Sequence, residues 1–312
     1  MILRAAAVLF CMAQGASAQT SDDVAQAVQN WLTDHSAHGV IAIKSPDAAL
    51  EVVDLGLPAD QAVELASLSK AITAICTATL VDEGLLAWVD PVSDYVDGFK
   101  GITIADLVTH QSGVAQDATQ TYMSAWLGDP QHRAPDVVAE MRKRGAPTGP
   151  QGNYAYSNDN YALLALVIEA AAQQSYQDTC QTRALAPAGV TAVPSGQSGA
   201  FLAWGGWTMR VGDYLRFHDH WFDTAQADFQ GPKAAIGGGA VYGLGMLSRT
   251  MQGGSNYWHF GALCFPGGLN AGSFAVAFHN AWRVVVAYDR CVDWPDMVEL
   301  DAAIVKAVFP DL

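Results

Sequence analysis

The spacing of apolar residues divides the chain into a first part with strands, a helical middle and a last part with strands. In the first part, a helical pattern over residues 21–34 precedes two short apolar runs typical of strands, 39–43 and 50–53. The middle part, to about residue 198, combines helical spacing with loops. In the last part, a predicted helix at 211–221 precedes three strand-like runs and a closing helix: 257–264, 273–279, 283–289 and 295–308.

This order of elements predicts an α+β fold. Strands from both chain ends can share one antiparallel sheet, flanked by helices, with an all-helical domain inserted between its two segments. We expect the sheet domain to comprise residues 19–66 and 199–312, and the helical domain residues 67–198. The helical domain would begin with the apolar helix that follows Ser67 and runs to about Glu83.

The first eighteen residues have the layout of a secretory signal peptide. Arg4 gives a basic start, residues 5–12 an apolar core and residues 16–18 a small-residue cleavage site. We therefore expect cleavage near Ala18 and a periplasmic or secreted protein. No later stretch is long and uncharged enough to predict a membrane span.

Composition narrows the classes of partner. The chain has 312 residues, of which 51% are hydrophobic and 15% charged, as expected for a globular protein with a large core. Its net charge of −15 leaves few cations to neutralise phosphates, which excludes nucleic acid as a partner. The sequence does not fix an oligomeric state.

A metal site is not expected. The four cysteines after the leader form no Cys-x-x-Cys pair of the kind that binds zinc. His218 and His220 lie two residues apart on a predicted helix, where side chains diverge, so the segment 218–220 is predicted to be solvent-exposed.

An exported protein can form disulfides. Cys264 and Cys291 end or follow apolar strand-like runs and are the favoured pair. Cys76 lies inside the apolar helix after Lys70, where we expect it to be a buried thiol.

Ser67 and Lys70 are candidates for nucleophilic chemistry. Residues three apart on a helix share a face, so the two side chains can touch. A serine needs a neighbouring base to take its proton, and a lysine can serve if burial depresses its pKa. Taken alone, the pair favours a capping serine and a solvated lysine over a catalytic pair.

Two residues of a later loop add groups suited to acyl transfer. Tyr156 offers a phenol that a nearby ammonium could keep ionised, which makes it a second candidate base. Asn158 carries both a donor and an acceptor with which to hold a substrate amide and Lys70.

A third segment can complete the site. His259 begins a strand-like run, and Ala262, just after Gly261, can present its backbone N–H group. Together with the N–H of Ser67, it would form an oxyanion hole for the negative charge that develops on a substrate carbonyl.

These three motifs, in this order, resemble those of the serine β-lactamase and penicillin-binding-protein superfamily, in its class C β-lactamase and DD-carboxypeptidase branch. Further stretches resemble family sequences in the same order: 82–95, 102–113, 156–164, 205–217 and 242–245. The resemblance implies the β-lactamase/transpeptidase-like fold, a covalent acyl-enzyme on Ser67, and no metal or organic cofactor.

The third motif departs from the family in a way that bears on substrate. His259 in its first place resembles the DD-peptidases, whereas Phe260 replaces the small hydroxyl residue that would hold a substrate carboxylate. We therefore predict an exported serine hydrolase that cleaves an amide or ester in a small molecule or peptide, with peptidoglycan-derived peptides as the leading class. A penicillin-binding or scaffold relative with little turnover and a β-lactamase are the alternatives, and either Lys70 or Tyr156 can be the base.

Overall fold

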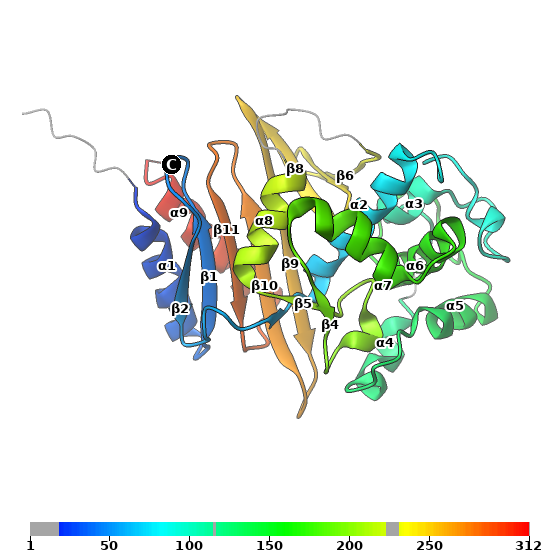
Figure 1. Ribbon diagram of the computed structural model, residues 1–312, viewed down its shortest axis with the longest axis horizontal. Helices are drawn as coiled ribbons and strands as arrows, with labels where there is room; N and C mark the ends of the chain where they lie inside the picture. Colours follow the sequence, from blue (N-terminus) through cyan, green and yellow to red (C-terminus); the bar gives the residue numbers. More distant parts are fainter. Residues whose placement is uncertain (1–18, 115–116, 223–230, 312) are drawn as a thin grey trace, which may run out of the picture.

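An eight-stranded antiparallel sheet forms the centre of the computed structural model, which describes residues 19–114, 117–222 and 231–311 (Figure 1). Its strand order is β2-β1-β11-β10-β9-β8-β7-β6. The strands are β1 (Gly39–Lys44), β2 (Glu51–Leu55), β6 (Ala234–Gly237), β7 (Ala240–Gly243), β8 (Met246–Met251), β9 (Gly254–Cys264), β10 (Asn270–Ala277) and β11 (Arg283–Tyr288).

Helices cover both faces of this sheet. Helices α1 (Ser21–Asp34) and α9 (Trp294–Val308) pack side by side on one face, against the alternate side chains that include Ile41 and Phe274. Helix α8 (Val211–Trp221) covers the other face, against β1 and β11. Since successive strand residues point to opposite faces, strands buried on both sides must be apolar throughout, as β1 and β11 are.

A helical region lies at the β6 end of the sheet (Figure 1). Its helices are α2 (Ser69–Asp82), α3 (Ile104–Val108), α4 (Thr119–Tyr122), α5 (Ala134–Lys143), α6 (Asn158–Ala172) and α7 (Tyr176–Cys180). A three-stranded sheet of β3 (Val63–Glu64), β5 (Trp207–Met209) and β4 (Val193–Pro194) joins this region to the main sheet. Within the described ranges, no helix is both long and apolar enough to cross a bilayer.

The predicted fold class, an antiparallel sheet with flanking helices and a helical insertion, is confirmed. The sequence missed β6, β7 and β8, because these strands are short, carry exposed residues and turn at consecutive glycines 237–239. The predicted signal peptide, residues 1–18, lies outside the described residues.

The prediction that segment 218–220 is solvent-exposed was wrong for His218. His218 is buried, and burial lowers its pKa to about 3. Asp219 forms ion pairs with Lys44 and with Arg283, at 3.2 Å from the guanidinium. Because α8 packs flat on the sheet, its polar side chains reach the cations at the ends of β1 and β11.

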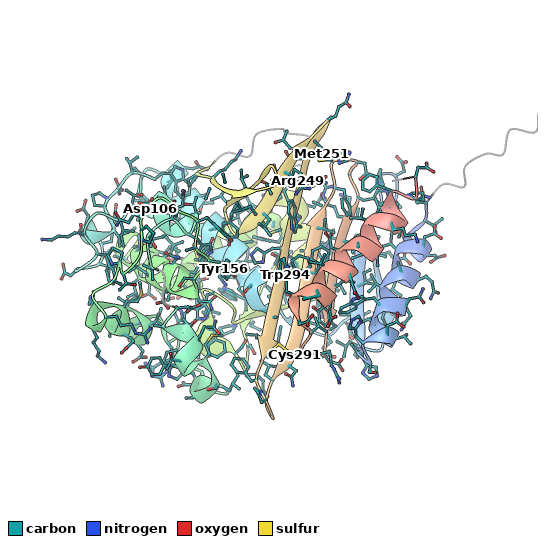
Figure 2. The ribbon with its side chains drawn as sticks, turned by 180° about the vertical axis from the view of Figure 1, so that it is seen from behind. Asp106, Tyr156, Arg249, Met251, Cys291 and Trp294 are labelled. Carbon is teal, nitrogen blue, oxygen red and sulfur yellow. A yellow bond between two sulfur atoms is a disulfide. The ribbon has the colours of Figure 1, made fainter. Side chains whose placement is uncertain are left out.

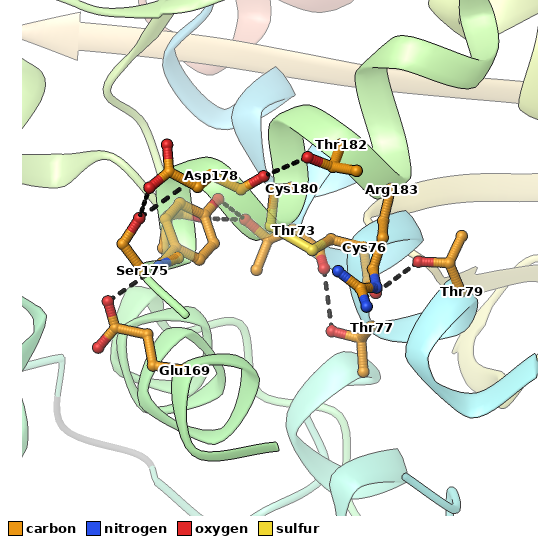
Figure 3. Close-up of a disulfide and its surroundings, with 12 residues drawn as sticks. Thr73, Cys76, Thr77, Thr79, Glu169, Ser175, Asp178, Cys180, Thr182 and Arg183 are labelled. Atoms are coloured by element: carbon orange, nitrogen blue, oxygen red, sulfur yellow. Dashed lines mark hydrogen bonds between the residues drawn. A yellow bond between two sulfur atoms is a disulfide. The ribbon is translucent and has the colours of Figure 1, made fainter. Parts of the chain in front are cut away.

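Two disulfides cross-link the part of the chain that the structure describes. Cys264 pairs with Cys291, across a Cα–Cα distance of 5.2 Å. The expectation of a free thiol at Cys76 was wrong, since this residue is buried but bonded to Cys180, which joins α2 to α7 (Figure 3). A separation of 104 residues carries no spacing signal, so only the packing of the two helices reveals this pair.

We predict that replacing both Cys76 and Cys180 by alanine lowers the free energy of unfolding by roughly 2–5 kcal/mol, because the bond closes a long loop in the unfolded chain. Urea denaturation of the oxidised protein measures the loss. The control is the variant with Cys264→Ala and Cys291→Ala. Its free energy of unfolding should fall by about 1 kcal/mol less than that of the first variant, since its loop of 27 residues is shorter. An unchanged urea midpoint in the first variant would contradict the account.

Candidate active site

A cavity of about 940 Å³ lies between β9 and the helical region. It brings together residues predicted from three separate motifs: Ser67, Tyr156, Asn158, His259 and Ala262. Lys70 lies fully buried beside Ser67, and Gly261 lies behind Ala262 on β9. The predicted site residues from the three motifs therefore converge on one place.

Ser67 precedes α2 rather than belonging to its first turn. It lies in a 3₁₀ turn, Ala66–Leu68, and α2 begins at Ser69. Ala66 has a φ of +48°, a left-handed conformation that is costly for a residue with a Cβ and is found preferentially at functional sites. This turn places the Ser67 side chain at the cleft while Lys70 stays beneath it.

Gly261 allows β9 to approach that turn closely. A Cβ at this position would lie 2.8 Å from the Leu65 carbonyl oxygen and 2.9 Å from the Ala66 Cβ, closer than atoms can pack. Strand β8 pairs with β9 only up to Trp258, so among the described strands residues 259–264 pair with β10 alone. The free edge of β9 therefore borders the cleft beside Ser67, where an oxyanion hole using the Ala262 N–H is expected.

Lys70 is held where its charge is unfavourable. Its Nζ lies 3.2 Å from the Ser67 Oγ and donates to the Trp204 carbonyl oxygen at 2.8 Å. Burial lowers the pKa of Lys70 to about 7, although the Asp117 carboxylate partly opposes this shift. A large fraction of the molecules thus carries a neutral amine next to the serine at neutral pH.

Hydrogen bonds and a disulfide fix α2 below the site. One turn after Lys70, Thr73 donates to the Ala203 carbonyl oxygen at 2.6 Å and shares a 2.6 Å hydrogen bond with Tyr176 of α7. The Cys76–Cys180 bond follows one further turn along (Figure 3). Residues 203–204 and α7 therefore hold Lys70 at its distance from Ser67.

Tyr156 is a proton donor in the free protein. Its hydroxyl donates to the Ser67 Oγ at 3.0 Å, and its ring lies 4.9 Å from the Lys70 Nζ. Although 41% of the residue is exposed along the cleft, the hydroxyl points inward, and its burial raises the pKa well above the ordinary value of 10. Between the two candidate bases, this geometry favours Lys70.

His110 positions Tyr156. Its Nδ1 accepts from the Ser157 N–H at 3.3 Å, and its carbonyl oxygen accepts from the Ala155 N–H at 2.9 Å. Its buried ring packs 4.5 Å from the ring of Tyr156. Burial, with the charge of Lys70, holds the pKa of His110 well below its usual value, so the ring is neutral.

Asn158 lines the cavity at the start of α6, but its described hydrogen bonds differ from the expected contact with Lys70. Its Nδ2 donates to Thr119 Oγ1 at 3.0 Å, and its backbone N–H donates to Asp117 at 3.1 Å. Its amide oxygen remains suited to receive a substrate N–H. The sequence analysis missed Asp117, since an isolated acidic residue in a polar loop carries no signal.

His259 and Phe260 point to opposite faces of β9. The Nδ1–H of His259 donates to the Phe260 carbonyl oxygen at 2.6 Å, and burial lowers its pKa to about 3, so the ring is uncharged. Phe260 stacks on Phe274 with ring centres 4.4 Å apart, and its ring edge meets Trp294. The motif therefore offers a substrate carboxylate neither a cation nor a hydroxyl.

In the part of the chain that the structure describes, one group of three residues has the spacing of metal ligands, and it lies outside the cavity lining. His35, Asp296 and Glu299 approach one another within 4.8 Å where α1 meets α9. The His35 Nε2 already lies 3.4 Å from a carboxylate oxygen of Asp296.

Sequence comparisons identify relatives of this chain. The sequence model of the family described as Beta-lactamase matches residues 24–288. Penicillin-binding protein 4* of Bacillus subtilis is 35% identical over 131 residues, which are 41% of this chain and 29% of that protein. Protein flp of Staphylococcus aureus is 33% identical over 121 residues, which are 36% of this chain and 24% of that protein. Each match thus spans less than a third of the relative's length.

Solved structures share the fold. A D-amino acid amidase from Ochrobactrum anthropi superposes with a TM-score of 0.72 at 16% identity, covering 92% of this chain and 98% of that one. A penicillin-binding protein from Bacillus halodurans gives a TM-score of 0.67 at 19% identity, covering 88% and 98%. At these identities the likeness shows the fold alone.

We predict that the rate at which a fluorophosphonate probe labels Ser67 rises about tenfold for each unit of increasing pH up to pH 7, and is constant at higher pH. The reason is that the reactive form needs Lys70 deprotonated. Lys70→Met should abolish this pH dependence together with most of the rate. Tyr156→Phe should keep the midpoint near pH 7, since its hydroxyl is protonated throughout. A midpoint near pH 10 in the unmodified protein would contradict the assignment.

Proposed function

Because the chain belongs to the β-lactamase family, we propose that it is an exported serine hydrolase that cleaves amide or ester bonds through an acyl-enzyme on Ser67. The observation that carries this proposal is the buried Lys70 amine, 3.2 Å from the Ser67 Oγ, with a pKa lowered to about 7. The leader at residues 1–18 supports export.

Acylation can be written with these groups alone. The Lys70 Nζ takes the proton of Ser67 as the Oγ attacks the substrate carbonyl, whose oxygen is held by the N–H groups of Ser67 and Ala262. Tyr156 then passes its own proton to the leaving atom and regains one from the Lys70 ammonium, beside which its ring lies. The leaving group departs protonated, and the acyl group stays on Ser67.

Deacylation uses the same base. Lys70, neutral again, accepts a proton from an incoming water, whose oxygen attacks the acyl carbonyl. The bond between the acyl carbon and Ser67 Oγ then breaks, and the Oγ takes a proton from the Lys70 ammonium, which returns the amine to its neutral form. One base serves both half-reactions, so the rate of each is expected to follow the same ionisation.

The cleft favours an apolar acyl group. Met123, Trp204, Leu263 and Phe265 are among the residues that line it. Amides or esters of apolar D-amino acids, including peptidoglycan-derived peptides, fit this lining, and the shared fold with a D-amino acid amidase supports that class. With Phe260 in place of a hydroxyl, β-lactams are expected to acylate slowly.

We predict measurable hydrolysis of p-nitrophenyl esters, and slower turnover of nitrocefin and of D-Ala-D-Ala peptides, when the purified protein is assayed on all three. Ser67→Ala should reduce ester hydrolysis by at least about 10³-fold, because it removes the nucleophile. Its fold can be checked by an unchanged melting temperature.

Two other outcomes discriminate the alternatives. A Ser67 adduct that forms but is not released would favour a binding relative with little turnover. Rapid nitrocefin hydrolysis would favour a β-lactamase and show that Phe260 does not exclude a substrate carboxylate. If the purified protein forms no fluorophosphonate adduct at Ser67, the proposal that it is an enzyme is refuted.

A further inference from the structure

One wall of the cleft is aromatic. Trp258 and Phe260 alternate along β9 and therefore point to the same face of the sheet, the face that α9 covers. From the first turn of α9, Trp294 meets the ring of Phe260 edge to face, with centres 5.3 Å apart. All three residues line the same cavity as Ser67.

Trp294 is not needed to pack its own helix. The residues of α9 that face the core are Met297, Leu300, Ile304 and Val308, whereas Trp294 is 60% exposed. Figure 2 shows Trp294 at the start of α9, facing the side of the molecule that carries Tyr156. An indole that is largely exposed yet borders an active-site cavity offers a large apolar surface to a ligand.

The other two rings are held in place from behind. Phe260 stacks on the buried Phe274, at 4.4 Å. Trp258 carries the Arg249 guanidinium 5.7 Å from its ring centre, a cation–π contact. The wall therefore has two rings fixed by neighbours and one exposed ring, so an aromatic group can bind without repacking the core.

The position of the proton donor assigns this wall to the leaving group. The leaving atom must lie near the Tyr156 hydroxyl to receive its proton, and the ring of Tyr156 packs 6.1 Å from the ring of His259. Phe260 follows His259 directly. It therefore lies near one end of the unpaired edge of β9, residues 259–264, whereas Leu263 lies near the other end. A substrate lying along that edge thus directs its leaving group toward Phe260 and its acyl group toward Leu263.

We propose that Trp294, Phe260 and Trp258 form a subsite for an aromatic leaving group, with Trp294 as the residue that determines this specificity. The inference rests on the proposed hydrolase function. The bond that breaks joins the acyl carbon to the leaving oxygen or nitrogen, which takes its proton from Tyr156, so no further reactant is required.

The test compares the benzyl and methyl esters of N-acetyl-D-alanine, whose leaving alcohols are similarly basic, so their ratio of kcat/KM reports binding rather than leaving-group chemistry. We expect a ratio of about ten or more for the unmodified enzyme. Trp294→Ala should lower this ratio about tenfold, and Trp294→Phe should restore most of it.

Val298 provides the matched control. It lies one turn further along α9, is 43% exposed and is not among the residues that line the cavity. Val298→Ala should leave the ratio of the two esters unchanged.

The outcomes separate this inference from the proposed function. If Ser67 is acylated by both esters but the ratio is near one, or is the same after Trp294→Ala, the subsite is refuted and the hydrolase stands. If neither ester nor a fluorophosphonate acylates Ser67, the proposed function itself fails.

Discussion

The site depends on keeping the Lys70 amine out of water. An ammonium is costly to bury. Among the described residues, the Trp204 carbonyl oxygen, the Tyr156 ring and the more distant Asp117 carboxylate compensate for part of this cost. Because this compensation is only partial, burial lowers the pKa of Lys70 into the neutral range. A full ion pair would keep the lysine charged, and an exposed position would return its pKa to about 10.4. Either arrangement would leave Ser67 without a base.

The surrounding fold maintains the 3.2 Å distance between the Lys70 amine and the Ser67 hydroxyl. The 3₁₀ turn before α2 separates Ser67 from the helix that buries Lys70. Gly261 lets β9 approach the turn, and Gly245 lets the end of the β7–β8 connection approach α2, where a Cβ would lie 2.5 Å from the Ala71 Cα. These contacts come from elements distant in sequence, so the chemistry depends on tertiary structure rather than on the Ser-x-x-Lys spacing alone.

The sequence predicted the parts of the site that lie in short motifs with helical or strand-like surroundings. Ser67, Lys70 and Tyr156 were identifiable because each motif follows from local spacing and the three occur in a familiar order. Residues that act through packing between distant elements were not identifiable. Asp117 occupies an ordinary polar loop, and Trp294 looks like any residue at the start of a helix until α9 is placed against β9. Helix and strand boundaries within an apolar run were predictable to a few residues, whereas short, Gly-rich strands were not.

The neutral state of the Lys70 amine near pH 7 can be observed directly. NMR spectra of the protein labelled with 13C at the lysine ε-carbon should show one resonance that titrates with a midpoint near 7 and disappears in Lys70→Met. A Lys70 resonance that titrates near pH 10 would show that the amine is charged at neutral pH, and would contradict its role as the base for Ser67.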